Sequence, residues 1–243
     1  MIDISAEPHA VSRFGRTLVE PTESPVKDTI QEQLECESGP SNYCVIFSQK
    51  PVSYCIGIVD MVGSTKLAAS LGITKMSRYY QNFLNLMSKI IEAYDGRVIK
   101  NIGDCLLFYF PHTSSSGNKS AITDCLECGL AMIDAHEFLC DQMKIDGLPC
   151  IDYRVSVDYG YIIPMKSTDS KFQDMIGPAV NMCSKINRCA EKNGVVIGGD
   201  LYHIAKQVNR VAFKEVRGCS AGFKHDYPVY SIARNRSGTQ GST

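Results

Sequence analysis

The stretch GRVIKNIGDCLLFYF, residues 96–110, decides the fold that this sequence predicts. It holds two short runs rich in β-branched and aromatic residues, Arg97 to Ile102 and Cys105 to Phe110, on either side of Gly103-Asp104. A Gly-Asp pair between two such runs is typical of a tight turn, so we expect a β-hairpin with the aspartate at its tip.

The flanking sequence predicts further strands and helices on both sides of the hairpin. Before it, Val52 to Val59 suits a buried strand, and apolar residues recur at helical spacing from Tyr80 to Tyr94. After it, we expect a long helix to about Met143, an alternating strand from Tyr153 to Tyr159 and, across Gly160, its partner at Tyr161 to Met165. The later elements are a helix over about Pro178 to Glu191 and strands at Val195 to Ile197 and Val229 to Ile232.

This order of elements predicts an α+β fold with a ferredoxin-like β-α-β-β-α-β core and extra C-terminal strands. In such a core, helices cover one face of an antiparallel sheet. We expect one domain over residues 43–234. Residues 1–42 have scattered prolines and no sustained hydrophobic period, which favours an N-terminal extension, a linker or a regulatory arm, and residues 235–243 read as a polar C-terminal tail.

Composition excludes several classes of protein. The formal net charge of −1 argues against a nucleic-acid binder that neutralises many phosphates. No stretch approaches the roughly 18 apolar residues of a membrane helix, and the N-terminus lacks the pattern of a secretory signal. The 11 cysteines have no regular spacing, so we expect reduced, mostly buried thiols in a cytoplasmic protein. Cys125 and Cys128 lack a second pair, which makes zinc there an unfavoured interpretation.

Two aspartates stand at strand ends that this topology brings together. Asp60 ends the first strand and Asp104 lies at the hairpin tip, and these strands are neighbours at the centre of the expected sheet. Carboxylates held this close repel, so the arrangement predicts divalent cations between them. The loop with Gly63, Ser64 and Thr65 opens a helix and offers backbone N–H groups to an anion. Each feature alone is also an ordinary turn or helix cap; together they suggest a nucleoside triphosphate.

The sequence around these residues resembles the class III nucleotidyl cyclase catalytic domain, the family of adenylate and guanylate cyclases. The matching blocks follow the family's order over roughly residues 50 to 234: IVDMVGSTKLA (58–68), GRVIKNIGDCLLFYF (96–110), VDYGYII (157–163), DMIGPAVNMCSKI (174–186) and YPVYSIA (227–233). The resemblance implies the class III cyclase fold and a product that is a 3′,5′-cyclic nucleotide plus pyrophosphate.

The resemblance implies a two-metal site and an adenylate-type base pocket. Asp60, Asp104 and the Met61 carbonyl would hold two Mg²⁺ or Mn²⁺ ions, which suit in-line displacement at the α-phosphorus. Lys100 and Asp174 occupy the base-selecting positions, where lysine donates to the adenine ring N1 and aspartate accepts from the amino group. A guanine-type site would have Glu and a small residue such as Cys there. The substrate expected is therefore ATP and the product cyclic AMP.

The remaining substrate contacts are implied on one helix and in a late loop. Asn181 occupies the position that orients the ribose, and Lys185 stands where the family has an arginine that grips the α-phosphate. Lysine cannot hold two oxygens in one plane. Either Lys185 suffices, or Arg188 on the same helix face takes this role, or the enzyme is slow. Arg217 is the residue expected to contact the triphosphate.

In the family the site is shared across a head-to-tail dimer, with the metals from one chain and the base-selecting pair from the other. This chain carries both sets, so a homodimer would hold two equivalent sites. The expected partners are ATP and a second copy, with an upstream sensor or regulatory partner acting through residues 1–42 left open. Two alternatives also stay open: a weakly active or inactive nucleotide-binding signalling module, which Lys185 favours, and a cyclase with another base preference.

Overall fold

The computed structural model describes residues 45–167, 174–219 and 227–235. Contacts within the chain separate Met1–Cys44 from Val45–Thr243, and every feature below belongs to the second unit. The expected N-terminal extension, residues 1–42, lies outside the described residues, as does the expected tail apart from Asn235.

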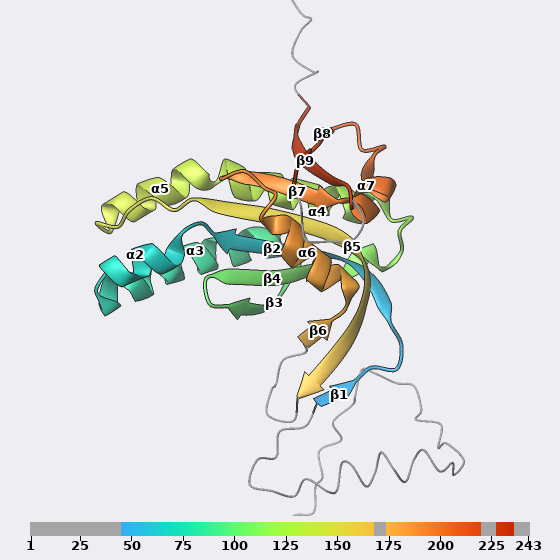
Figure 1. Ribbon diagram of the computed structural model, residues 1–243, viewed down its shortest axis with the longest axis horizontal. Helices are drawn as coiled ribbons and strands as arrows, with labels where there is room; N and C mark the ends of the chain where they lie inside the picture. Colours follow the sequence, from blue (N-terminus) through green and yellow to red (C-terminus); the bar gives the residue numbers. More distant parts are fainter. Residues whose placement is uncertain (1–44, 168–173, 220–226, 236–243) are drawn as a thin grey trace, which may run out of the picture. The chain divides into compact units, whose positions relative to one another are not determined.

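Nine strands in the described part of the chain form one sheet, in the order β3-β4-β2-β5-β7-β9-β8, with β1 and β6 paired to β5 off this path (Figure 1). The strands are β1 (Val45–Phe47), β2 (Val52–Met61), β3 (Arg97–Ile102), β4 (Cys105–Phe110), β5 (Tyr153–Ser167), β6 (Asp174–Ile176), β7 (Gly194–Gly198), β8 (Val211–Glu215) and β9 (Val229–Arg234). The helices are α2 (Ser64–Ser70), α3 (Ile73–Ala93), α4 (Lys119–Asp134), α5 (His136–Ile145), α6 (Pro178–Asn187) and α7 (Gly199–Ala205), with the 3₁₀ turn η1 (Pro111–Ser114). The sheet is mostly antiparallel, which confirms the predicted α+β fold class.

The hairpin of β3 and β4 forms where the sequence predicts it. Ile102 pairs with Cys105 across the turn, and β4 continues the sheet by pairing with β2. Cys105 in turn lies opposite Asp60. Strand β2, which the sequence predicted at Val52 to Val59, and the β3–β4 hairpin are therefore neighbours, as expected.

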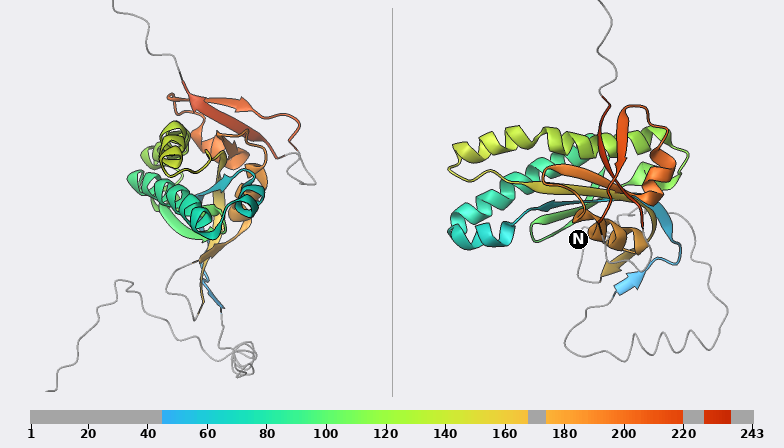
Figure 2. Two further views of the ribbon diagram at one scale, coloured as in Figure 1. Left: turned by 90° about the vertical axis from the view of Figure 1, so that its left-hand side faces the viewer. Right: turned by 45° about the horizontal axis from the view of Figure 1, so that its top comes forward.

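Helices cover both faces of the sheet, and the prediction that they cover one face is wrong. On one face α3, α4 and α5 pack on the strands through residues that include Phe83 and Leu126 (Figure 2, left). On the other face α6 packs Cys183 against Ile56 of β2. The reason lies in β2 itself, because Val59 is buried on the first face and Ile56 on the second. A strand that is apolar on both faces needs cover on both.

Strand β5 runs straight through Gly160, where the sequence analysis expected a hairpin. It pairs with β2 along its whole first part, with Tyr54 opposite Gly160. A Cβ atom at Gly160 would lie 3.4 Å from the Ala179 Cβ at the start of α6. That distance is ordinary van der Waals contact, so Gly160 is a residue of a continuous strand beneath the start of α6 and does not reverse the chain.

The long helix expected to reach Met143 is two helices, because the chain bends at Ala135 between α4 and α5. The Ala135 N–H still donates to the Ala131 carbonyl, at 3.0 Å. Leu139 and Met143 of α5 belong to the buried core.

Four cysteines expected as thiols form two disulfides, Cys140–Cys150 and Cys189–Cys219. Each pair joins elements that meet only in the folded chain, so residue spacing carried no signal for them. The free thiols among the described residues are Cys55, Cys105, Cys125, Cys128 and Cys183. No helix in the described ranges is long and apolar enough to cross a membrane.

Candidate functional site

Asp60 and Asp104 lie close together at one end of the sheet, where β2 finishes beside the turn between β3 and β4. Asp60 is the next-to-last residue of β2 and lies opposite Cys105, whose chain neighbour in the hairpin turn is Asp104. Burial raises the pKa of Asp60 to about 6, the nearby Asp104 carboxylate adds to this rise, and the charge of Arg154 opposes it. The fold thus brings together the two carboxylates that the sequence analysis singled out.

Arg154 is a third charged group at this end, and the sequence analysis did not single it out. It lies directly opposite Asp60 in the pairing of β2 with β5. Its Nε atom is buried and has no hydrogen-bond partner among the residues the structure describes. The sequence signal that could have identified Arg154 is an arginine within the alternating apolar pattern of β5.

The donor atoms at this end fit a hard divalent cation. Mg²⁺ and Mn²⁺ take carboxylate and carbonyl oxygens, which Asp60, Asp104 and the adjacent Met61 backbone offer. A cation would also relieve the repulsion that contributes to the raised pKa of Asp60. Burial and the two carboxylates raise the pKa of Cys105 to about 12, so its sulfur stays a neutral thiol beside them.

The predicted anion-binding loop follows directly on these carboxylates. Gly63 has φ of 73°, a left-handed conformation that side chains disfavour, and this turn starts α2 with Ser64 buried and Thr65 exposed. The Val62 N–H donates to the Asp152 carbonyl at 2.8 Å. The loop is therefore tied to the residue that precedes β5.

Lys100 of β3 and Asp174 of β6 form an ion pair, although they are 74 residues apart in the chain. The Asp174 Oδ1 atom also accepts a hydrogen bond from the Met175 N–H at 2.7 Å, which orients the carboxylate. The two side chains are 42% and 24% exposed, so a ligand can reach them. The fold therefore brings together the two residues expected to read the base.

Helix α6 turns the other predicted residues away from the sheet. Asn181 and Arg188, the residue that caps the helix, are exposed, and Lys185 is partly exposed. Cys183 and Ile186 are fully buried on the opposite side. The three polar residues thus share the outer face of α6, as their spacing predicts.

Both ends of α6 are held on β5. At its start, Gly177 has no room for a side chain, since a Cβ atom would lie 2.7 Å from the Tyr161 carbonyl oxygen. At its end, the Asn187 side-chain amide donates to the Ser156 Oγ at 3.1 Å and to the Arg154 carbonyl at 3.3 Å. These contacts set the position of the polar face above the strands.

Arg217 lies far from the carboxylates within one chain. It is exposed in the turn after β8, and β8 is at the opposite edge of the sheet from β3. The Cys189–Cys219 disulfide ties this turn to the residues that follow α6. One chain alone does not bring Arg217 to Asp104.

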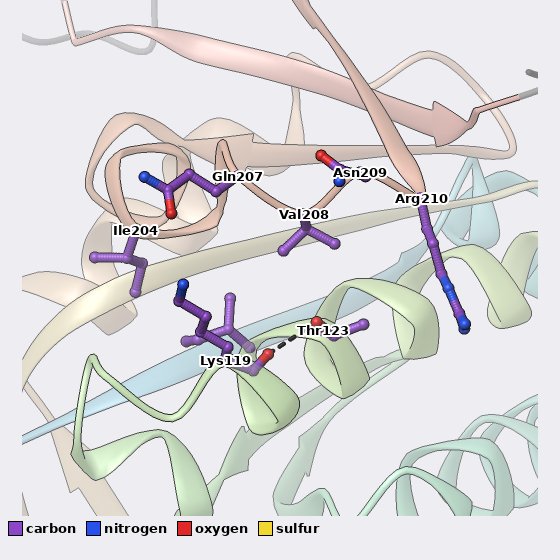
Figure 3. Close-up of a pocket in the computed structure, with 8 residues that line it drawn as sticks. Lys119, Thr123, Ile204, Gln207, Val208, Asn209 and Arg210 are labelled. Carbon is purple, nitrogen blue, oxygen red and sulfur yellow. Dashed lines mark hydrogen bonds between the residues drawn. The ribbon is translucent and has the colours of Figure 1, made fainter.

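A separate cavity of about 360 Å³ lies between α4 and the connection from α7 to β8 (Figure 3). Its lining residues are Lys119, Ile122, Thr123, Ile204, Gln207, Val208, Asn209 and Arg210. None of them is a predicted site residue, and the cavity does not belong to the candidate site.

The chain resembles known cyclases in sequence and in fold. Residues 47–232 match the family profile described as the adenylate and guanylate cyclase catalytic domain. A cytidylate cyclase of Staphylococcus aureus is 23% identical over 152 residues, which cover 60% of this chain and 36% of that protein. An adenylate cyclase of Glutamicibacter nicotianae is 26% identical over 146 residues, covering 60% of this chain and 30% of that protein. The chain thus spans about a third of the length of these relatives.

Among solved structures, the adenylyl cyclase CyaB from P. aeruginosa superposes with a TM-score of 0.68 at 24% identity. The match covers 77% of this chain and 97% of that one. At this identity the likeness concerns the fold, and it agrees with the architecture of the sheet and helices described above.

Proposed function

We propose that this chain, which belongs to the adenylate and guanylate cyclase catalytic-domain family, converts ATP into 3′,5′-cyclic AMP and pyrophosphate. In this reaction the ribose 3′-oxygen forms a new bond to the α-phosphorus while the bond from that phosphorus to pyrophosphate breaks, and the 3′-hydroxyl proton is released. The observation that carries the proposal is the ion pair of Lys100 with Asp174.

The polarity of this pair favours two of the four bases. Adenine offers a ring nitrogen that accepts from Lys100 and an amino group that donates to Asp174, and cytosine offers the same order. Guanine and uracil present a ring N–H and a carbonyl instead. Lys100 would then face a second donor and Asp174 a second acceptor. We place ATP first because lysine and aspartate are the adenine-type pair of the family. CTP is the second candidate, since two relatives at 23% identity are cytidylate cyclases.

The other residues supply binding and orientation. Two Mg²⁺ or Mn²⁺ ions held by Asp60, Asp104 and the Met61 carbonyl would supply charge stabilisation at the entering and leaving oxygens. The N–H groups of the loop from Gly63 to Thr65 face the phosphate chain. Asn181 orients the ribose, and Lys185, aided by Arg188, neutralises the charge that grows on the α-phosphate. Arg217 binds the terminal phosphates.

We propose further that two copies assemble each site. The carboxylates come from one protomer, while Lys100, Asp174 and the outer face of α6 come from its partner. A mixture of two inactive variants, Asp104→Asn and Lys100→Ala, tests this arrangement. Half of the dimers would be mixed, with one intact site in each, so the mixture should recover about a quarter of the wild-type activity. No recovery in mixed dimers that form normally would contradict a shared site.

The function is tested by giving the purified protein Mn²⁺ with ATP, CTP, GTP or UTP and separating the products by chromatography. Mostly cyclic AMP supports the proposal, and mostly cyclic CMP reverses the order of the two candidates. Cyclic GMP or cyclic UMP would contradict the argument from the Lys100–Asp174 pair. Bound nucleotide without any cyclic product would favour the alternative of a signalling module, with Lys185 as its cause.

A further inference from the structure

Three potential metal ligands gather at the start of α5, outside the candidate cyclase site. His136 begins the helix, Cys140 lies one turn later, and Cys150 belongs to the loop before β5. The His136 Nε2 atom is 3.5 Å from the Cys140 Sγ and 3.7 Å from the Cys150 Sγ. One donor atom of each residue lies within 4.8 Å of the others. In the structure the two cysteines are joined as a disulfide.

We propose that reduction of the Cys140–Cys150 disulfide creates a zinc site made of these two thiolates and the His136 imidazole. Zinc bonds of about 2.3 Å to sulfur and about 2.0 Å to nitrogen, at tetrahedral angles, put a ligand nitrogen about 3.5 Å from each ligand sulfur. The nitrogen–sulfur distances of 3.5 and 3.7 Å already match this geometry. Once their bond is broken, the two sulfur atoms have to separate, and the imidazole has to turn its Nε2 atom from the Ile151 carbonyl toward the metal.

A carboxylate stands beside these ligands. The Asp152 Oδ1 atom is 3.8 Å from the His136 Nε2 and can complete a four-coordinate site. Lys192 and Asn193 donate to the two oxygens of that carboxylate at 3.0 and 2.8 Å. Partners of this kind hold a ligand in orientation at many metal sites.

The chemistry balances in electrons and protons. A dithiol supplies two electrons and two protons, becomes a disulfide, and leaves Cys140 and Cys150 as thiols. Zinc binding then releases the thiol protons. The His136 Nε2 faces the Ile151 carbonyl at 3.0 Å in the structure, so the imidazole must carry its proton on Nδ1 in the zinc-bound form to free the lone pair on Nε2.

The other disulfide, Cys189–Cys219, offers a matched control. Within the described ranges, the group of His136, Cys140 and Cys150 is the one cluster of at least three His, Cys, Asp or Glu side chains close enough to hold an ion. Reduction of Cys189–Cys219 therefore yields two thiols without the third ligand.

The test uses the full chain, reduced with a dithiol and freed of it by anaerobic gel filtration. After zinc is added and excess removed, metal analysis should find one zinc per reduced chain and none per oxidised chain. Cobalt(II) in place of zinc should give a thiolate-to-metal charge-transfer band. The readouts are metal content and spectrum, so they are independent of the proposed cyclase activity.

Variants identify the ligands. Cys150 is exposed, so Cys150→Ser should fold normally by circular dichroism and lose at least about 100-fold in zinc affinity, as should His136→Asn. The double variant Cys189→Ser/Cys219→Ser and the variant Asp104→Asn should both keep the zinc. Zinc that survives Cys150→Ser, zinc lost with Asp104→Asn, or no zinc in the reduced wild type would each overturn the proposal.

Discussion

Asp60 of β2 lies directly opposite Arg154 of β5, with Asp104 close by in the hairpin turn. The Arg154 charge favours the ionised form of Asp60, yet burial and the Asp104 carboxylate outweigh it, since the pKa of Asp60 rises to about 6. The protein without metal therefore holds an unfavourable negative charge at this end of the sheet. This balance makes the role of the two carboxylates testable by stability as well as by activity.

Asp60→Asn should raise the melting temperature in EDTA, because the amide removes the buried charge and its repulsion with Asp104. The same change should lower turnover by at least about 100-fold and abolish the stabilisation that Mn²⁺ gives the wild type. Calorimetry with and without Mn²⁺ checks both effects. Asp141→Asn, at an exposed position on α5, is the control and should behave as wild type. Full activity in Asp60→Asn would exclude the two-metal assignment.

Exchanging the base-selecting pair should change the substrate. Lys100→Glu should reduce turnover of ATP by at least about 100-fold, because a carboxylate faces an acceptor on adenine. The double variant Lys100→Glu/Asp174→Cys should gain turnover of GTP relative to ATP. Product chromatography at equal nucleotide concentrations measures both. Lys166→Glu, at an exposed position on β5, is the matched charge control. Unchanged ATP preference in Lys100→Glu would refute the base argument.

Lys185→Arg tests whether the natural lysine limits the rate. A planar guanidinium can hold two phosphate oxygens, so kcat should rise by about tenfold or more while KM changes little. Steady-state kinetics with ATP measures the two constants, and Lys206→Arg on the exposed end of α7 is the control. An unchanged kcat would mean that Lys185 suffices or that Arg188 supplies the clamp, and Arg188→Lys would then separate these two cases.

Stability should fall as the pH rises from about 4 to about 7 because of Asp158. This carboxyl is buried, and burial raises its pKa to about 7, with the charge of Asp200 adding to the rise. The Tyr227 hydroxyl and the Tyr159 and Leu201 N–H groups donate to the carboxylate and oppose this rise. The folded chain thus binds a proton that the unfolded chain releases above about pH 4. The stability that this bound proton gives the folded chain is complete below about pH 4 and is lost as the pH passes about 7.

Asp158→Asn should remove this pH dependence of the free energy of unfolding. In the wild type the change amounts to something on the order of 2–4 kcal/mol between about pH 4 and about pH 7. Denaturant unfolding at pH 5 to 8 compares the variant with the wild type. Tyr227→Phe removes a hydrogen bond that lowers the pKa of Asp158, so it should shift the loss of stability to higher pH. Identical slopes in Asp158→Asn and the wild type would show that this carboxyl does not titrate as described.

Local sequence patterns predicted the parts of the site that depend on strand ends and turns. The hairpin at Gly103-Asp104 forms as expected because turn residues between two β-rich runs specify it locally. The central position of β2 next to that hairpin then follows from the order of elements, and with it the meeting of Asp60 and Asp104. The ion pair of Lys100 with Asp174 joins the two residues that the family resemblance assigns to base selection.

Long-range packing decided what these patterns could not. The apolar run of β2 indicated burial but not that α6 would cover its second face, and Gly160 resembled a turn although β5 continues through it opposite Tyr54. The same apolar strand is compatible with helices on one face or on both, and the same glycine is compatible with a turn or with a continuous strand. Only the fold distinguishes these arrangements.

By itself, then, the sequence determined the hairpin, the strand that carries Asp60 and the polar face of α6, because these depend on neighbours along the chain. The tertiary structure alone decided that Arg154 faces Asp60 and that His136, Cys140 and Cys150 converge. The physical reason is that strand register and helix packing bring such residues together at spacings for which no local pattern exists.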